Sequence, residues 1–458
     1  MCVRFSELDG ASVGVWGAGR EVASFARQLA RRLPSARIAV VAFDDALPED
    51  VRDTLRAPQA RIVTAAEAVP ALSACDVVVR SPGVSIHRPQ LRALRETGTP
   101  VTTATALWLA EHGGEGVIGV TGTKGKSTTA ALAAHLARAA GREARLAGNI
   151  GAPALDLLDA QDAEVVVLEL SSYHIADLET GPQVALVTNL FREHTDWHGG
   201  EEAYRADKLR LLDLPGVRTR VINARDPGLT AALGDANMAA AAGTSTSADR
   251  LAYGVPRAWD VLDGGIALRG EQVVAGGELP LRGEHNALNL CGALTALEAL
   301  GIAPPPLPAS LHGFQALAHR LETVAERDGV LWVNDSISTT PESTLAALTS
   351  FPGREIVLIG GGQDRGQDYA ALGRALAGAG ATVIGVPSTG ARLLAAARDA
   401  GTPPARAIEA LDLADAVARA HEFARPGSVI LLSPAAPSYD NYRDFEERGE
   451  RFRALAAS

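Results

Sequence analysis

The apolar positions of the first hundred residues come in short runs separated by amphipathic stretches. Residues 12–19 form an apolar run that ends in a glycine turn, and the following stretch REVASFARQLARRL has the spacing of a helix with one apolar face. Further apolar runs cover residues 37–42, before the acidic pair Asp44 and Asp45, and residues 76–79, before a Ser-Pro-Gly turn. This rhythm predicts a small doubly wound α/β domain.

The alternation restarts after a glycine-rich patch at residues 112–116, which we interpret as a hinge. VIGVTGTKGKST precedes the amphipathic run TTAALAAHLARAAG, and EVVVLEL and VALVTNL have the pattern of buried parallel strands. The run APPPLP, which starts at residue 303, is too rich in proline for a helix or a central strand and predicts a linker. Beyond it, VLWVND, EIVLIGG, ATVIGV and SVILLS indicate a third α/β unit. We therefore predict an α/β protein of three domains, residues 1–112, 113–303 and 304–458.

Composition narrows the class of protein. Hydrophobic residues make up 47% and charged residues 21% of the 458 residues, as in a globular protein with real cores. A net charge of -11 and 4% aromatics argue against a nucleic-acid or acidic-membrane partner, so any phosphate must be held by local groups. The three cysteines have neither disulfide nor metal spacing. With no leader pattern and no long apolar segment, we expect a soluble cytoplasmic protein.

The strongest chemical signal is TGTKGKST at residues 121–128, between an apolar run and a long amphipathic helix. Glycines let backbone N–H groups surround phosphate oxygens, Lys126 can reach the outer phosphates, and Ser127 can bind Mg²⁺. The strict P-loop spacing requires glycine where Val120 stands. The strand–loop–helix context nevertheless favours phosphate binding over an ordinary flexible loop.

Two further sets of residues lie at the ends of predicted strands. Gly17 and Gly19 resemble half of a dinucleotide fingerprint, but Val22 occupies the third glycine position, so a tight turn is as good an interpretation as a pyrophosphate contact. Glu169 and His194 each follow a buried strand, where ligands of open α/β sheets gather. Together with phosphate they suit Mg²⁺, although singly they suit a helix cap and a structural histidine.

Three other charged residues have ordinary alternatives. Lys208 lies in YRADKLRLL, an amphipathic helical pattern in which a lysine normally faces solvent. Arg320, in HRLE, can clamp a phosphate, and Asp335, in NDS, can hold a ribose hydroxyl or a water on Mg²⁺. A turn former or a surface ion pair explains either residue equally well.

Taken in order, these pieces resemble the Mur ligase family, and within it the MurD-type ligases that add glutamate to UDP-N-acetylmuramoyl-L-alanine. The resemblance covers nearly the whole chain. Its markers are SPGV (81–84), TGTKGKST (121–128), GNIG (148–151), LELSSYH (168–174), REHTDWH (192–198), RADKLRL (205–211), GEHNALN (283–289), HRLE (319–322), NDSISTT (334–340), GGGQDRGQD (360–368) and SYDNYRDFEERG (438–449).

The resemblance implies an N-terminal Rossmann-like domain that binds the UDP substrate, a central P-loop ATPase domain and a C-terminal Rossmann-like domain that binds the amino acid. ATP phosphorylates the substrate carboxylate, the amine of glutamate attacks the acyl phosphate, and phosphate leaves. The resemblance also implies residue roles. Lys126, Lys208 and His194 are catalytic; Gly122, Thr123, Lys124, Gly125, Lys126, Ser127, Thr128, Asn286, Arg320 and Asp335 bind ATP; Ser127, Glu169, His194 and Lys208, the last carbamylated, hold Mg²⁺; and Gly17, Ser81, Gly83, Asn149, Ser171, Thr339, Arg365, Ser438 and Phe445 bind the substrates.

Several positions depart from the usual MurD pattern. Lys124 replaces an asparagine of the phosphate loop, Ile337 and Arg365 replace lysines, and Thr340 replaces an asparagine. These departures resemble a divergent group that adds L-glutamate and works with a separate epimerase acting on the product. We therefore expect an L-glutamate ligase with that functional link, and we expect it to be a monomer.

The alternatives are the same reaction with D-glutamate, a folylpolyglutamate synthetase, or a P-loop regulator that hydrolyses ATP only to change shape. The pattern before residue 116 argues against the folate enzyme, and the predicted metal-binding residues together with the third domain argue against the regulator.

Overall fold

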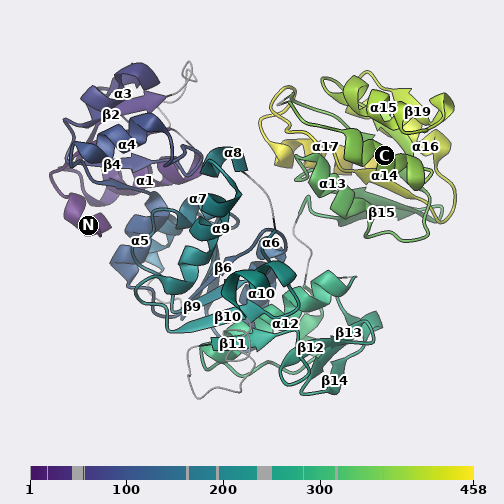
Figure 1. The fold of residues 1–458 in the computed structure, drawn as a ribbon, viewed down its shortest axis with the longest axis horizontal. Coiled ribbons are helices and arrows are strands. Elements are labelled where there is room, and N and C mark those ends of the chain that lie inside the picture. Colours follow the sequence, from purple (N-terminus) through teal and green to yellow (C-terminus); the bar gives the residue numbers. More distant parts are fainter. Residues whose placement is uncertain are drawn as a thin grey trace. The chain divides into compact units, whose positions relative to one another are not determined.

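The computed structural model describes residues 2–17, 19–43, 55, 57–160, 164–191, 195–234, 250–281, 283–314, 318–364 and 366–457, without the side chains of residues 195 and 196. The chain forms two compact units, Met1–Phe314 and Gln315–Ser458, which we call unit 1 and unit 2 (Figure 1). Among the described residues, no helix is both long and apolar enough to cross a membrane. The three domain boundaries that we predict stay a prediction.

The first sheet of unit 1 confirms the doubly wound pattern of the opening residues. Its order is β3-β2-β1-β4-β5 and its strands pair in parallel. Val15 packs with Phe25 on one face, while Trp16 packs with Leu72 and Leu91 on the other, so helices cover both faces. The elements are η1 (Phe5–Leu8), β1 (Ser12–Trp16), α1 (Arg20–Arg32), β2 (Arg37–Phe43), β3 (Arg61–Thr64), α3 (Ala65–Leu72), β4 (Val77–Arg80), α4 (Pro89–Glu96), β5 (Val101–Thr102) and α5 (Ala104–His112).

The second sheet of unit 1 is parallel, with the order β11-β10-β9-β6-β8-β7. Helices α6 and α12 pack together against it through Leu132, Leu136 and Leu294. Its elements are β6 (Val117–Thr121), α6 (Lys126–Ala139), β7 (Ala144–Gly148), η2 (Ala154–Asp159), β8 (Val165–Glu169), α7 (Ser172–Ile175), β9 (Val184–Val187), α8 (Thr195–His198), α9 (Glu201–Leu209), η3 (Arg210–Asp213), β10 (Thr219–Asn223), α10 (Pro227–Leu233), β11 (Arg250–Tyr253) and α12 (Glu284–Ala299).

Two features of unit 1 differ from the sequence-based expectation. A small antiparallel sheet, β12 (Trp259–Leu262), β13 (Gly265–Leu268) and β14 (Glu271–Val274), followed by η5 (Gly276–Glu278), packs on α12 and was not predicted. The proline-rich run expected to be a linker belongs to unit 1 and continues into η6 (Ala309–Leu311). Leu307, Leu311 and Phe314 pack onto the α6–α12 core, so this segment lies on a hydrophobic surface.

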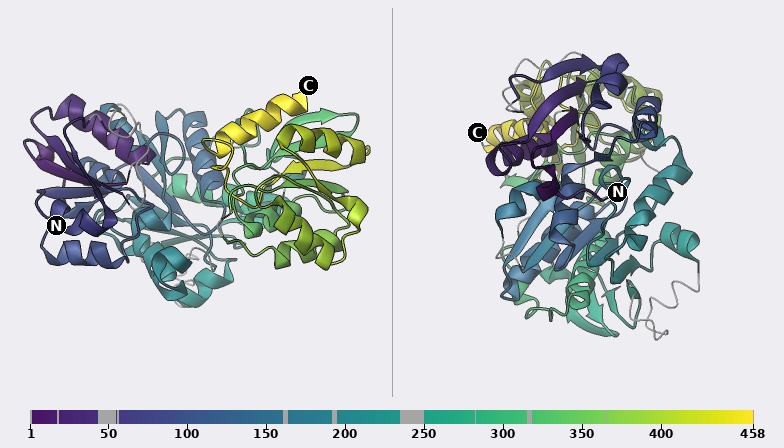
Figure 2. Two further views of the ribbon diagram at one scale, coloured as in Figure 1. Left: turned by 90° about the horizontal axis from the view of Figure 1, so that it is seen from above. Right: turned by 90° about the vertical axis from the view of Figure 1, so that its left-hand side faces the viewer.

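Unit 2 is a six-stranded sheet in the order β15-β16-β20-β17-β18-β19, antiparallel only between β15 and β16. Helices α13, α14 and α15 cover one face, through Leu358, and α16 and α17 cover the other, through Ile359 (Figure 2). The elements are β15 (Glu322–Arg327), β16 (Val330–Asn334), α13 (Pro341–Leu348), β17 (Ile356–Gly360), α14 (Ala370–Gly378), β18 (Thr382–Gly385), α15 (Gly390–Asp399), η7 (Pro404–Arg406), β19 (Ala407–Glu409), α16 (Leu413–Phe423), β20 (Val429–Leu432) and α17 (Phe445–Ala457).

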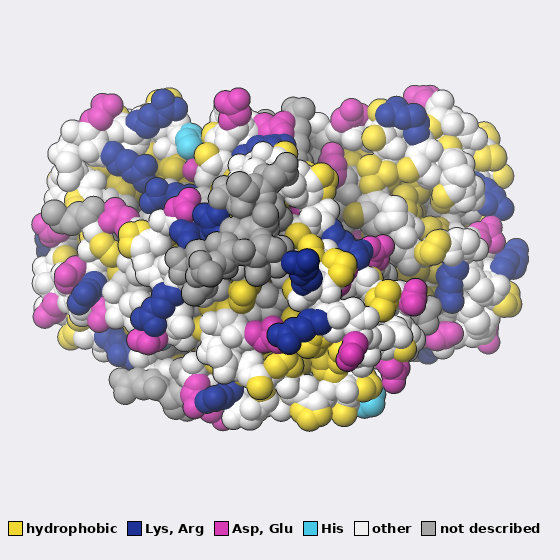
Figure 3. All heavy atoms as spheres, turned by 60° about the horizontal axis from the view of Figure 1, so that its bottom comes forward, with side chains coloured by type: hydrophobic (Ala, Val, Ile, Leu, Met, Phe, Trp, Pro, Cys, Tyr) yellow, Lys and Arg dark blue, Asp and Glu magenta, His cyan; other side chains and the backbone are white. Residues whose placement is uncertain are grey.

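Surface charge agrees with local rather than global phosphate recognition. On the described part of the face in Figure 3, basic and acidic side chains are interspersed. A long-range positive field is not expected from such a mixture, in line with the net charge of -11.

A buried ion pair ties the first and second sheets of unit 1 together. Arg80, at the end of β4, has no solvent exposure and pairs with the buried carboxylate of Asp177, which follows α7. The same guanidinium donates to the backbone carbonyls of Val84 and Tyr173. Removal of Arg80 therefore leaves several carbonyls without their donor and leaves the buried Asp177 carboxylate with the longer Arg95 pair, in which Nη2 lies 3.6 Å from Oδ2.

We expect Arg80→Met to lower the free energy of unfolding by about 3 to 5 kcal/mol, the usual cost of breaking a buried pair from one side. The measurement is urea-induced unfolding followed by tryptophan fluorescence. Arg205→Met is the matched control, because Arg205 forms a partly exposed i,i+4 pair with Glu201 on α9, and its loss should cost about 0.5 kcal/mol or less. Equal losses in the two variants would show that the Arg80 pair carries no special weight.

Candidate nucleotide and substrate site

The loop between β6 and α6 has a backbone that requires glycine at two positions. Gly122 has φ +148° and Gly125 has φ +80°, values that residues with a side chain rarely adopt. A Cβ added at Gly122 would stand 1.8 Å from Thr188 Oγ1, so the loop packs directly on the end of β9. Because the N-cap residue of α6 is Gly125, no side chain caps this helix, and its N-terminal N–H groups suit a phosphate.

Two residues at the end of β9 hold the middle of the loop. Asn189 Oδ1 accepts from the N–H of Lys124 at 2.7 Å, and Asn189 Nδ2 donates to the carbonyl of Lys124 at 2.9 Å. Thr188 Oγ1 donates to the same carbonyl at 2.6 Å. Sequence reasoning gave these two residues no role, although their strand-end position was a usable signal.

Glu169 brings together residues predicted for two different ligands. Its carboxylate is fully buried, and Ser127 Oγ donates to Oε2 at 2.8 Å while Asn149 Nδ2 donates to Oε1 at 3.1 Å. A carboxylate beside a hydroxyl is the oxygen-rich chemistry that Mg²⁺ prefers, so these residues fit the ion that the family implies. His194, the other predicted ligand at this sheet edge, lies outside the described residues.

Lys208 does not face solvent. The structure buries it on α9, and its Nζ donates to the carbonyl of Gly122 at 2.8 Å and lies 5.0 Å from the Tyr204 ring centroid. The interpretation of Lys208 as a solvated surface residue is therefore wrong, because its helical face packs on the phosphate loop rather than on water. Lys126 Nζ donates to the carbonyl of Thr123 at 2.9 Å.

The remaining loop residues take different positions. The hydroxyl of Thr123 is buried against Tyr204 Oη at 2.9 Å, and Thr128 lies buried in α6. Asn286, on the first turn of α12, accepts from Asn289 Nδ2 at 3.2 Å. Asn289 in turn lies against Gly125, where an added Cβ would be 2.4 Å from its Oδ1. Asn286 therefore contacts Asn289, which in turn contacts the phosphate loop.

The distribution of lysine is a signal that the sequence analysis missed. Of the 43 lysine and arginine residues, only Lys124, Lys126 and Lys208 are lysines. Two lie in the phosphate loop, and the third donates to it. Arginine serves every other basic position, so lysine in this chain is concentrated at the phosphate loop.

The residues predicted for the UDP substrate gather at the carboxyl ends of β1 and β4. Gly17 has φ +86°, and a Cβ there would be 2.8 Å from Ser81 Cβ, so close packing explains this glycine. The carbonyl of Gly83 accepts from Trp197 Nε1 at 3.1 Å. This hydrogen bond joins the loop after β4 to α8.

Helix α1 supports the central sheet through two residues that sequence reasoning missed. Arg20 donates to the carbonyls of Gly148 and Asn149 at 2.8 and 3.0 Å and so holds the GNIG loop. Glu21 Oε1 lies 2.9 Å from His174 Nε2, and Ser171 Oγ, predicted to meet the substrate, lies 2.6 Å from His174 Nδ1. Burial raises the pKa of Glu21, but the charge and hydrogen bond of His174 lower it, and the net pKa is below the usual value.

In unit 2, Asp335 supports the turn that carries Arg320. Its Oδ1 accepts from the N–H of Leu321 at 3.2 Å and its Oδ2 from Ser433 Oγ at 2.8 Å. Burial raises the pKa of Asp335 to about 6, against the opposing effect of its hydrogen bonds and of Arg320. The carboxyl is thus mostly ionised at neutral pH and largely hidden from solvent.

The residues of unit 2 that are predicted to bind the amino-acid substrate come from adjoining segments of the chain. Phe445, at the start of α17, accepts from Ser336 Oγ at 2.8 Å through its carbonyl, and its ring lies edge-on to His319. Ser438 is buried, and Thr339 is half-buried before α13. Arg448, which sequence reasoning missed, donates to Ser336 Oγ at 3.0 Å and to nearby carbonyls. Arg365 lies outside the described residues.

The sequence of the chain matches known protein families and curated proteins. Residues 120–297 match the Mur ligase middle domain, and residues 319–436 match the Mur ligase glutamate ligase domain. A protein of Micromonospora sp. named UDP-N-acetylmuramoyl-L-alanine–L-glutamate ligase is 44% identical over 98% of this chain and 97% of its own length. A protein of the same name from Salinispora tropica is 42% identical over 98% of both chains.

Solved structures show the same fold. UDP-N-acetylmuramate–alanine ligase MurC from Thermotoga maritima has a TM-score of 0.58 and 18% identity, with 98% of this chain and all of that chain covered. At this identity the likeness concerns the fold alone. The sequence matches carry the classification, and by them the chain belongs to the Mur ligase family of ATP-dependent ligases.

Proposed function

We propose that this enzyme joins L-glutamate to the alanyl carboxylate of UDP-N-acetylmuramoyl-L-alanine in peptidoglycan precursor synthesis, at the expense of ATP. The observation that carries the proposal is the shared carboxylate of Glu169, which hydrogen-bonds both Ser127 and Asn149. Ser127 lies in the first turn of α6, the helix that suits the ATP phosphates, and Asn149 is the residue expected to meet the muramoyl substrate. The relatives at 42 and 44% identity carry the name of this reaction.

The proposed chemistry follows from the poor reactivity of a carboxylate toward amines. Transfer of the γ-phosphoryl group of ATP to the alanyl carboxylate gives an acyl phosphate with a good leaving group. The amine of glutamate then attacks the carbonyl carbon, and the C–O bond to phosphate breaks. Lys126 offsets negative charge on the transferred phosphoryl group. Ser127, Glu169, His194 and carbamylated Lys208 would hold Mg²⁺, which would supply further charge neutralisation.

The choice of the L enantiomer rests on the amino-acid side of the enzyme. Ile337, half-buried after β16, stands where MurD-type ligases usually have a lysine, so one ammonium is absent from unit 2. A carboxylate of D-glutamate posed against that position has no cation and is costly to bury. Thr340, which replaces an asparagine, caps α13 by accepting from the N–H of Ser343 at 3.3 Å. The D-glutamate reaction is the remaining alternative.

We expect Lys126→Ala to abolish ligation and leave the fold intact, because the change deletes a loop cation without opening a core cavity. Phosphate release with both substrates measures activity, and circular dichroism checks the fold. Lys126→Arg is the matched variant, because it keeps the charge and loses the compact ammonium. Near-native turnover of the alanine variant would remove the phosphate-loop assignment.

Lys208 is expected to carry a carbamate. CO₂ reacts with the neutral amine, and a buried lysine gives up its charge more readily than an exposed one. Lys208→Ala should lose activity and regain part of it with a small carboxylate at high concentration. The chain has only three lysines, so few other side-chain amines compete for CO₂. With ¹³C-labelled CO₂ we expect one carbamate signal, from Lys208, which is absent in Lys208→Arg. Full activity of Lys208→Ala without added carboxylate would contradict the assignment.

The enzyme is expected to prefer L-glutamate over D-glutamate when assayed with UDP-N-acetylmuramoyl-L-alanine and ATP, with ligated product measured directly. Ile337→Lys, which restores the usual ammonium, should narrow that preference by improving the use of D-glutamate. A native preference for the D enantiomer would identify an ordinary MurD-type reaction and leave the ligase chemistry in place.

A further inference from the structure

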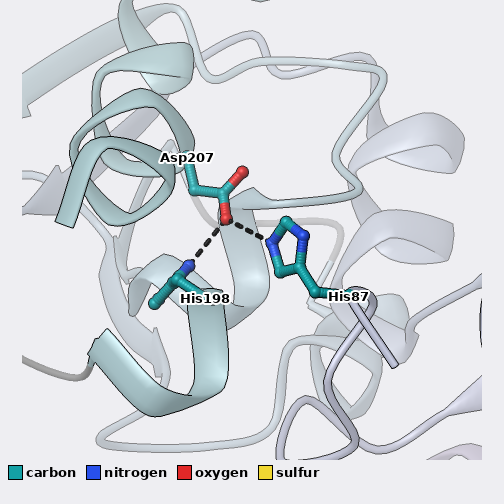
Figure 4. Close-up of side chains that lie close together, drawn as sticks. All are labelled: His87, His198 and Asp207. Atoms are coloured by element: carbon teal, nitrogen blue, oxygen red, sulfur yellow. Dashed lines mark hydrogen bonds and ion pairs between the residues drawn. The ribbon is translucent and has the colours of Figure 1, made fainter. Parts of the chain in front are cut away.

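Three side chains of unit 1 that are not among the predicted Mg²⁺ ligands lie close together (Figure 4). Asp207 Oδ2, on α9, lies 2.6 Å from His198 Nδ1 of α8 and 3.0 Å from His87 Nε2 of the loop after β4. Their ligand atoms all lie within 4.8 Å of one another. Two imidazole nitrogens thus point at one carboxylate oxygen, and each of the three side chains comes from a different segment of the chain.

The two rings are held from behind. The second ring nitrogen of His198, Nε2, lies 2.9 Å from Ser172 Oγ, and the His198 ring is fully buried beside Tyr204. The His87 ring lies edge-on to Trp197, with a centroid distance of 5.7 Å. The hydrogen bond between His198 Nε2 and Ser172 Oγ is of the kind that fixes the tautomer and direction of a metal-binding imidazole.

We propose that His87 Nε2, His198 Nδ1 and Asp207 Oδ2 form a binding site for a transition-metal dication of the Zn²⁺ type. Two imidazoles and one carboxylate are ligands that Zn²⁺ favours, whereas Mg²⁺ requires mostly oxygen ligands. The side chain of His87 is 30% exposed, so a fourth position is open to water. The dication replaces the protons that otherwise lie between the ring nitrogens and the oxygen.

The fit requires only a small adjustment. Two ligands bound to Zn²⁺ at tetrahedral angles stand about 3.4 Å apart, compared with 2.6 and 3.0 Å here. His87 lies in a partly exposed loop and can move outward to lengthen its 3.0 Å distance. The 2.6 Å distance to the buried His198 lengthens through a shift of the Asp207 side chain, which is 14% exposed. The bound metal would fasten that loop, which also carries Ser81 and Gly83, to α8 and α9.

The test is competition for Zn²⁺ between the full chain and a chromophoric chelator, with Mg²⁺ in excess so that the oxygen-rich site is filled. The native protein should retain one equivalent of Zn²⁺. His87→Gln, on the partly exposed loop and so least disturbing to the fold, and Asp207→Asn should each bind more than ~100-fold more weakly, because even loss of an outer partner of a metal ligand costs 10–100-fold.

Two control variants keep the cluster intact. His112→Gln alters a histidine stacked on Trp108, and Cys2→Ser removes an exposed thiol, and both should bind Zn²⁺ as the native chain does. Co²⁺ in the native protein should show the visible absorption of a four-coordinate site, lost in His87→Gln. Equal Zn²⁺ affinity in the native, His87→Gln and Asp207→Asn proteins would overturn the proposal.

Discussion

The buried carboxylate of Glu169 is the constraint on which the site depends. A carboxylate without water needs hydrogen-bond donors in its place, and Glu169 takes one from Ser127 and one from Asn149. These donors follow two different strands, β6 and β7, that flank β8 in the sheet. The ends of three neighbouring strands are thereby fixed to one another, and the phosphate loop and the GNIG loop meet at a defined point.

Amine chemistry is a second constraint, visible once the loop and α9 are placed together. Arginine can satisfy most surface ion pairs, and this chain uses it almost everywhere. A guanidinium cannot be carbamylated, and its planar fork is larger than an ammonium. Lysine is restricted to positions 124, 126 and 208, which lie in the phosphate loop or donate to it, and these are the positions for which we propose a part in phosphoryl transfer.

Much of the fold follows from local patterns. Apolar runs that end in glycine, followed by helical spacing, predicted the βα units, because both periods are set by backbone geometry. The β12–β14 hairpins escaped prediction because strands such as EQVV are short and mixed in polarity. Proline in APPPLP indicated a break in secondary structure but could not reveal the apolar surface on which Leu307 packs.

The site divides in the same way. The phosphate loop was predictable because its chemistry lies within eight consecutive residues. The burial of Lys208 was not predictable from its helix, since the group that receives its hydrogen bond, the Gly122 carbonyl, is far away in the sequence. The hydrogen bonds by which Arg20, Asn189 and Arg448 hold nearby loops are likewise tertiary contacts, and no spacing of residues along the chain predicts them.

The contact between Gly122 and Thr188 limits how this loop can diverge. Any side chain at position 122 would occupy the space of Thr188 Oγ1, and a residue without a hydroxyl at position 188 would lose the hydrogen bond to the Lys124 carbonyl. The first change forces a clash and the second removes a hydrogen bond, and the double change still strains the backbone at φ +148°. The effect of a substitution at position 122 therefore depends on the residue at position 188, so the phosphate loop and the end of β9 constrain each other's divergence.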